Sequence, residues 1–120
     1  MLLIKTYIDN SKIHGIGLFA DQLIRKGQAV WKENPLIDVR FPSLQKLNLS
    51  KEAGKQIKSF SWFNKEKNVW TLPGDNARFM NHSTHPNCGL NEKEVVVAKR
   101  LILPGEELTE DYRTFHTGSI

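Results

Sequence analysis

Turn-forming residues divide this chain into short apolar runs, and the shortness of these runs limits the secondary structure that the chain can form. The runs hold five to seven residues rich in leucine, β-branched or aromatic side chains, a composition typical of strands. Five of them are predicted strands: 2–8, 28–33, 68–72, 94–99 and 107–112. Turns with glycine or proline are predicted at 25–27, 73–76 and 104–105. The pattern favours a mostly β domain.

One stretch, from Ser43 to about Ser59, has helical spacing instead. Its apolar residues recur at intervals of three and four: Leu44, Leu47, Ala53, Ile57 and Phe60. Ser43 and Ser50 are both suitable helix N-caps. Gly54 weakens a continuous helix, so two short helices are an alternative. The predicted fold class is therefore mostly β with a short helical insert.

Length and composition indicate the number of domains and the cellular setting. A chain of 120 residues, 39% hydrophobic and 25% charged, is expected to form a single domain over residues 1–120. Its one cysteine, Cys88, cannot form an internal disulfide, which fits a reducing intracellular setting. No apolar run approaches the ~20 residues that cross a bilayer, and residues 1–5 are too short for a secretory signal. We therefore expect a soluble protein without a membrane partner.

The formal net charge of +4 could favour nucleic acid or an acidic partner. The basic residues do not form one block, however, and a solvated surface is the simpler interpretation. Charge alone does not select a function.

Two glycines lie one residue apart in the segment His14–Ala20. Such a Gly-x-Gly lets the main chain approach a ligand closely. A dinucleotide fingerprint would need a third glycine and a following helix, and this segment has neither. Taken alone, the segment is equally typical of an ordinary hairpin or bulge.

Two later segments carry further polar chemistry. In residues 78–88, Asn81 and Asn87 offer amides that both donate and accept, and Pro86 fixes a turn. Residues 105–112 end in Tyr112, whose hydroxyl could reach a cleft from the end of a strand. A single tyrosine in such a place more often only packs.

Taken in this order, the three segments resemble the SET-domain methyltransferases. That family carries a Gly-x-Gly, then an Arg-Phe-x-Asn-His-Ser-x-x-Pro-Asn-Cys segment, then Glu-Leu-Thr-x-Asp-Tyr. In this chain the three motifs begin at Gly15, Arg78 and Glu107, and the resemblance spans Ser11 to Phe115. It implies a compact, β-clip-like fold in which residues 78–87 help to form a pseudoknot with the chain end.

The resemblance also implies S-adenosyl-L-methionine as cofactor. The Gly-x-Gly main chain would cradle its methionine part, the Asn81 side chain would hold the methionine end, and the His82 main chain would meet the adenine. Carried over by motif, the cofactor residues are Gly15, Ile16, Gly17, Arg78, Phe79, Asn81 and His82. The family's three-cysteine zinc element after the last motif is missing, so Phe115, rather than His116, is expected to cover the adenine.

The reaction implied is methylation of a lysine side chain on a protein, such as a histone or another basic protein, in the cytoplasm or nucleus. A free lysine has a pKa of about 10.4, so making its amine neutral near pH 7.4 costs roughly 4 kcal/mol. A desolvated channel beside a sulfonium would lower that pKa, and Tyr112 would be the catalytic residue that orients the amine. The segment 41–63 would help to set substrate choice.

The family's Tyr-x-Gly, often found in the strand after the first motif, is absent from residues 30–36. Leu90 matches a position that often crowds the lysine, and a leucine there predicts a di- or trimethyl product. The alternative is that Leu90 only packs in the core.

Two other functions remain open. His82, His85 and Cys88 are spaced by three and could bind zinc, although Pro86 breaks a helix there. A non-catalytic SET-fold binding module could instead grip nucleic acid, with the aromatics of residues 60–65 as a stacking platform. For the enzyme, nucleic acid is expected only through the context of the substrate, and a homodimer is left open.

Overall fold

The computed structural model describes residues 1–111 of the chain. Within them, short strands dominate and the one α-helix, α1, spans Lys51–Phe60. The strands are β1 Thr6–Asn10, β2 Ile16–Ala20, β3 Ala29–Trp31, β4 Val39–Phe41, β5 Trp62–Asn64, β6 Val69–Leu72, β7 Asn81–His82, β8 Cys88–Leu90, β9 Val96–Ala98 and β10 Thr109–Glu110. Two 3₁₀ turns are η1 Gln45–Leu47 and η2 Asn76–Phe79. The mostly β fold with a helical insert is confirmed.

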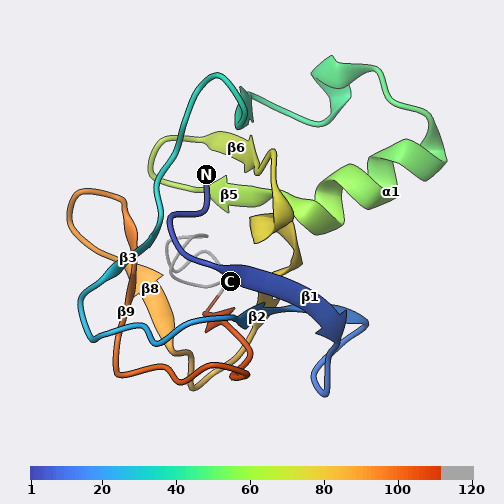
Figure 1. The fold of residues 1–120 in the computed structure, drawn as a ribbon. Coiled ribbons are helices and arrows are strands. Elements are labelled where there is room, and N and C mark those ends of the chain that lie inside the picture. Colours follow the sequence, from blue (N-terminus) through green and yellow to red (C-terminus); the bar gives the residue numbers. More distant parts are fainter. Residues whose placement is uncertain (112–120) are drawn as a thin grey trace.

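The strands form several small sheets rather than one large one (Figure 1). β1 and β2 are an antiparallel hairpin, and β3, β9 and β8 form a three-stranded antiparallel sheet. β4, β6 and β5 form a second such sheet, next to the end of α1. β7 and β10 pair in parallel, which joins residues 81–82 to residues 109–110. No helix within residues 1–111 has the length and apolar character needed to span a bilayer.

The predicted strands are present, but the first is displaced. It was expected at 2–8 and lies at 6–10 because the first residues cross to β3 instead. Leu2 forms a bridge with Trp31, and the Leu3 N–H donates to the Val30 carbonyl at 2.9 Å. The hydrogen-bonding partner of the N-terminal segment is thus set by a long-range contact that local composition does not encode.

The helical stretch is split in two, as the alternative expected, but not at Gly54. The break falls at Asn48, whose φ of 51° is left-handed, and α1 begins after Ser50. The Ser50 hydroxyl accepts a hydrogen bond from the Ala53 N–H at 3.2 Å, which confirms it as the N-cap. Gly54 lies inside α1, where an added Cβ would meet nothing within 4 Å.

The core lies between the sheets and is made of small and medium apolar side chains around two tryptophans. Trp31 and Trp62 meet edge to face, with ring centroids 4.8 Å apart. The remaining buried apolar side chains of this cluster are Leu18, Ala20, Ile24, Val30, Ala77, Met80, Cys88, Val96, Ala98, Ile102 and Leu108. α1 contributes no buried residue, so it lies on the surface of the domain.

Asn87 ties the second and third sequence segments together. Its Nδ2 donates to the Glu107 carbonyl at 2.8 Å, and its Oδ1 accepts from the Thr109 N–H at 2.9 Å. The Asn87 N–H in turn donates to the Thr109 hydroxyl at 3.2 Å. These buried bonds, with the parallel pairing of β7 and β10, hold residues 81–88 against 107–110; we call this region the clasp. The expected meeting of these two segments is therefore observed.

Candidate functional site

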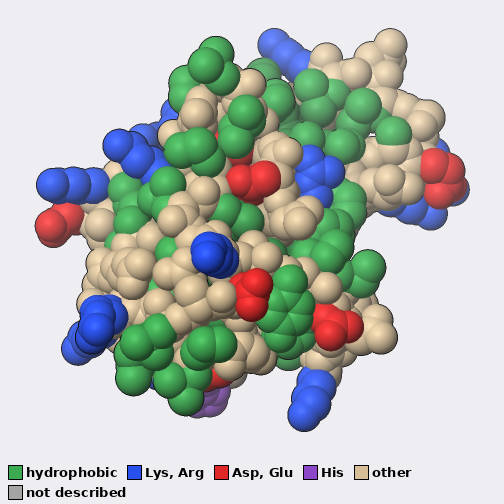
Figure 2. All heavy atoms as spheres, viewed as in Figure 1, with side chains coloured by type: hydrophobic (Ala, Val, Ile, Leu, Met, Phe, Trp, Pro, Cys, Tyr) green, Lys and Arg blue, Asp and Glu red, His purple; other side chains and the backbone are tan. Residues whose placement is uncertain are grey.

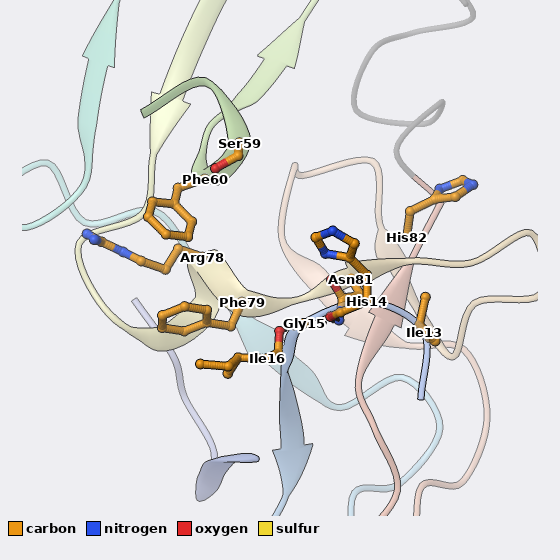
Figure 3. Close-up of a pocket in the computed structure, with 10 residues that line it drawn as sticks. All are labelled: Ile13, His14, Gly15, Ile16, Ser59, Phe60, Arg78, Phe79, Asn81 and His82. Carbon is orange, nitrogen blue, oxygen red and sulfur yellow. Dashed lines mark hydrogen bonds between the residues drawn. The ribbon is translucent and has the colours of Figure 1, made fainter. Parts of the chain in front are cut away.

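A cavity of about 560 Å³ opens where three separate parts of the chain meet (Figure 3). They are the loop before β2, the end of α1, and the stretch from η2 into β7. The volume is in the range of small-molecule sites. Its lining residues are Ile13, His14, Gly15, Ile16, Ser59, Phe60, Arg78, Phe79, Asn81 and His82. Six of the residues assigned by motif to the cofactor are therefore brought together here.

The loop before β2 is shaped by its own hydrogen bonds. The Ser11 hydroxyl accepts from the Ile13 N–H at 2.9 Å and the His14 N–H at 3.2 Å, which closes a tight turn. Gly15 follows with a φ of +49°, a left-handed conformation that favours glycine. The turn sets main-chain atoms of Gly15 and Ile16 along the cavity wall.

Gly17, also assigned to the cofactor by motif, does not line the cavity. It is buried beside the segment that precedes β10. An added Cβ would lie 2.4 Å from Glu107 Oε2 and 3.1 Å from Ser11 Cβ. The second glycine thus leaves room for the Glu107 carboxylate to approach the main chain.

Asn81 fixes the loop from the opposite wall. Its Nδ2 lies 3.0 Å from the His14 carbonyl, 3.4 Å from the Ile16 carbonyl and 2.9 Å from Glu107 Oε2. All three partners are acceptors, so the orientation of the amide is determined by chemistry. No donor among residues 1–111 meets Asn81 Oδ1. The cavity wall thus carries an amide oxygen available to a ligand donor.

Glu107 is a residue that the sequence did not single out for the site. Its carboxylate accepts from the Ser11 hydroxyl at 2.8 and 2.9 Å and from Asn81 Nδ2. It thereby joins the loop and Asn81 into one network. Its partner Ser11 is 96 positions away along the chain, so no local pattern could have indicated this role.

An aromatic group forms one end of the cavity. The rings of Phe60 and Phe79 meet edge to face with centroids 5.5 Å apart, and the Arg78 guanidinium lies 5.4 Å from the Phe60 centroid. Arg78 also donates to the Pro73 carbonyl at 2.8 Å. Figure 3 shows these three side chains grouped with Ile16. Phe60 and Ser59 were not predicted for this site, because they come from the helical insert.

His82 lies at the other end of the cavity. Its Nδ1 is 3.8 Å from Asp111 Oδ1, and Figure 3 shows its ring turned away from the Phe60–Phe79 group. Because His82 pairs with Glu110 across the parallel β7–β10 ladder, its main chain is held by the clasp.

Next to the cavity wall, the clasp buries a carboxyl group. Glu110 is fully buried, and within residues 1–111 neither of its carboxylate oxygens has a hydrogen-bond partner. Burial raises the pKa of Glu110 well above its ordinary value, because an ion is poorly solvated there. Burial, together with the nearby Glu110, also raises the pKa of the Cys88 thiol to about 12.

The described residues give the zinc alternative no support. Within residues 1–111, no three His, Cys, Asp or Glu side chains are grouped so that they could hold a metal ion.

Leu90 lies away from the large cavity. It packs against the buried cluster and lines a separate hollow of about 50 Å³ with Trp31 and Trp62. Charged pairs surround this hollow: Arg40 with Glu33 at 2.6 Å, and Lys67 with Glu94. Leu90 is half-buried: one part of it packs on the core and another part lines this hollow. The predicted catalytic Tyr112 and the predicted adenine cover Phe115 lie outside the described residues, as does His116.

Comparison with known proteins bears on this site. The family model of the SET domain matches residues 15–113, from the first glycine of the loop to just beyond the clasp. Human histone-lysine N-methyltransferase 2D is 31% identical over 114 residues, covering 89% of this chain and 2% of the relative. Human histone-lysine N-methyltransferase 2B is 36% identical over 112 residues, covering 86% of this chain and 4% of the relative. The chain thus spans a small part of these curated relatives.

Solved structures agree on the fold. A crystal structure of a candidate histone methyltransferase from Plasmodium falciparum superposes with a TM-score of 0.60 at 20% identity. The match covers 92% of this chain and 95% of that one.

Proposed function

The chain belongs to the SET-domain family, and from this premise we propose that it methylates lysine side chains of a protein with S-adenosyl-L-methionine. One observation carries the proposal furthest: the Gly15–Ile16 loop, Arg78–Phe79 and Asn81–His82, distant in sequence, line one cavity. The histone-lysine methyltransferase names of relatives 31–36% identical support the same activity.

The residues of the cavity fit the cofactor. The Asn81 Oδ1, which accepts no hydrogen bond from residues 1–111, is an acceptor suited to the ammonium of the methionine end, and the turn at Gly15 brings main-chain groups to the same wall. The Phe60–Phe79 pair offers an apolar surface. When bound, S-adenosyl-L-methionine supplies a methyl group already activated on a sulfonium, so the protein itself mainly has to bind and orient.

The substrate is proposed to be a lysine of a histone or another basic protein, which places the enzyme in the nucleus or on chromatin if histones are the target. Tyr112 is proposed to orient the lysine amine, and Leu90 is proposed to leave room for a di- or trimethyl product. Mass spectrometry of a long reaction checks the second point, because a product that stops at monomethyl-lysine with excess cofactor contradicts it. Leu90→Tyr is expected to shift the product toward monomethylation.

Titration calorimetry tests cofactor binding directly. One S-adenosyl-L-methionine per chain is expected, and Asn81→Ala is expected to weaken binding by about 1–3 kcal/mol, because the hydrogen bonds of Asn81 to the loop and to Glu107 and the Oδ1 acceptor are all lost. Asn10→Ala is the matched control, since Asn10 is exposed on β1. No binding up to millimolar cofactor would contradict the proposal.

A second experiment separates catalysis from binding. Tyr112→Phe is expected to abolish methyl transfer to a panel of basic proteins while leaving cofactor affinity nearly unchanged, because its hydroxyl acts mainly in the transition state. Tyr7→Phe is the control, because this only other tyrosine stacks on Phe19 at 5.4 Å. Wild-type turnover in the Tyr112 variant would show that Tyr112 only packs, and cofactor binding without any transfer would favour the non-catalytic module.

A further inference from the structure

The basic residues are spread along the chain, but their excess over the acidic residues lies in one segment. Residues 43–67, the lysine-rich insert, hold six lysines and two glutamates, whereas the rest of the chain holds eleven basic and eleven acidic residues. The formal charge of +4 is therefore entirely that of the insert. A positive charge that only served solubility would have no reason to be concentrated in this way.

The helix of the insert arranges three of these lysines in a row. Lys51, Lys55 and Lys58 are spaced by four and three, so they share one face of α1 over a rise of about 10 Å. All three are exposed, and none forms an ion pair with another described residue. The helix carries no buried residue, and Figure 1 shows it reaching away from the strands at the edge of the molecule. Figure 2 shows Lys or Arg side chains at the border of this projecting part.

We propose that this lysine face of α1 binds the phosphate backbone of double-stranded nucleic acid, independently of base sequence. Duplex DNA presents one negative charge per ~1.7 Å of its axis, so three flexible ammonium groups on one helix face can each reach a phosphate. An acidic protein is the less suitable partner. Protein interfaces are depleted in lysine and rely on apolar or aromatic anchors at their centre, whereas this face presents three lysines and no aromatic side chain.

The lysine face lies on the same helix that borders the large cavity. The far end of α1 supplies Ser59 and Phe60 to the large cavity, so the same helix borders both surfaces. A protein already bound to nucleic acid would then be held beside the cavity while α1 contacts the phosphates. The proposal goes beyond methyl transfer and does not depend on it.

Fluorescence anisotropy with a labelled DNA duplex of about 21 base pairs, two helical turns, tests the proposal over a range of salt concentrations. The whole chain is expected to bind at ~50 mM salt, with affinity that falls as salt rises. Changing all three lysines (Lys51→Gln, Lys55→Gln, Lys58→Gln) is expected to weaken binding about tenfold or more and to reduce the salt slope by about 3. The corresponding triple arginine variant should retain binding, and circular dichroism checks that each variant is folded.

The matched control removes the same charge elsewhere, with Lys5→Gln, Lys26→Gln and Lys32→Gln, all exposed and outside the insert. It is expected to leave the salt slope nearly unchanged. Equal losses in both triple variants would overturn the proposal, because the affinity would then reflect net charge alone. Absence of binding at ~50 mM salt would also overturn it. Tighter binding to poly-glutamate than to the duplex would assign the face to an acidic protein instead.

Discussion

The clasp and the lysine-rich insert occupy the same small domain but are held in opposite ways. In the clasp, Asn87 and Thr109 are buried and bonded to each other across 22 positions of sequence. In the insert, α1 has no fully buried residue and depends more on local features such as its Ser50 cap. The cavity lies where the two meet, with Asn81 and His82 from the clasp and Ser59 and Phe60 from α1.

This difference in burial indicates where substitutions should be tolerated. A buried polar group that loses its partner costs the whole desolvation of the group left behind, whereas an exposed group exchanges its partner for water. Substitutions in the clasp should therefore affect the stability of the entire domain, and substitutions in α1 should affect mainly the helix and the cavity edge.

Asn87→Ala is expected to have the largest effect. It removes the bonds to the Glu107 carbonyl and the Thr109 N–H and leaves both buried groups without partners. The free energy of unfolding should fall by about 2–4 kcal/mol, measured by urea denaturation. Asn10→Ala, at an exposed position, should change it by no more than about 0.5 kcal/mol. A small loss in the free energy of unfolding for Asn87→Ala would show that the clasp is no more sensitive to substitution than α1.

Glu110→Leu is expected to stabilise the clasp, by about 1–3 kcal/mol near pH 8, because an unpaired buried carboxyl is replaced by an apolar side chain. The effect should depend on pH. The pKa of Glu110 is raised on folding above the ordinary 4.5, so the wild-type protein takes up a proton when it folds, and loses stability as pH rises through that window.

The gap between the Glu110→Leu variant and the wild type should therefore be smallest at pH 4 and widen as pH rises. Thermal melting from pH 4 to 8 measures it. Glu92→Leu, at an exposed position, is the control and should show a small difference that stays constant. A constant gap for Glu110→Leu would contradict the raised pKa.

Ser50→Ala should act on the insert alone. Loss of the bond from the Ala53 N–H should reduce the stability of α1 by about 1 kcal/mol, with a smaller change in global unfolding. Amide hydrogen exchange separates the local stability of α1 from the global stability of the domain. Faster exchange confined to 51–60 supports a helix held by local features, and faster exchange in β7 and β10 as well contradicts it.

Gly54→Ala is expected to have the smallest effect and the opposite sign. Gly54 lies inside α1, and an added Cβ would meet nothing within 4 Å. Alanine should therefore stabilise the helix by about 0.5–1 kcal/mol, seen as slower amide exchange in α1. A destabilised variant would show that the surface of α1 at Gly54 is covered in solution.

The sequence by itself determined the class of fold and the family. Strand-forming runs, turn residues and helical spacing are local properties, so the mostly β fold, the helical insert and the Ser50 cap follow from neighbouring residues. The three motifs likewise indicated Gly15, Ile16, Arg78, Phe79, Asn81 and His82, which the structure brings to one cavity.

Which groups complete the site depends on the tertiary fold. Glu107 enters it because the chain returns to within hydrogen-bonding distance of Ser11, and Phe60 enters it because α1 ends against Phe79. Likewise, the absence of a side chain at Gly17 leaves room for the carboxylate of Glu107. These roles depend on contacts between residues far apart in sequence, which no local spacing or residue type specifies.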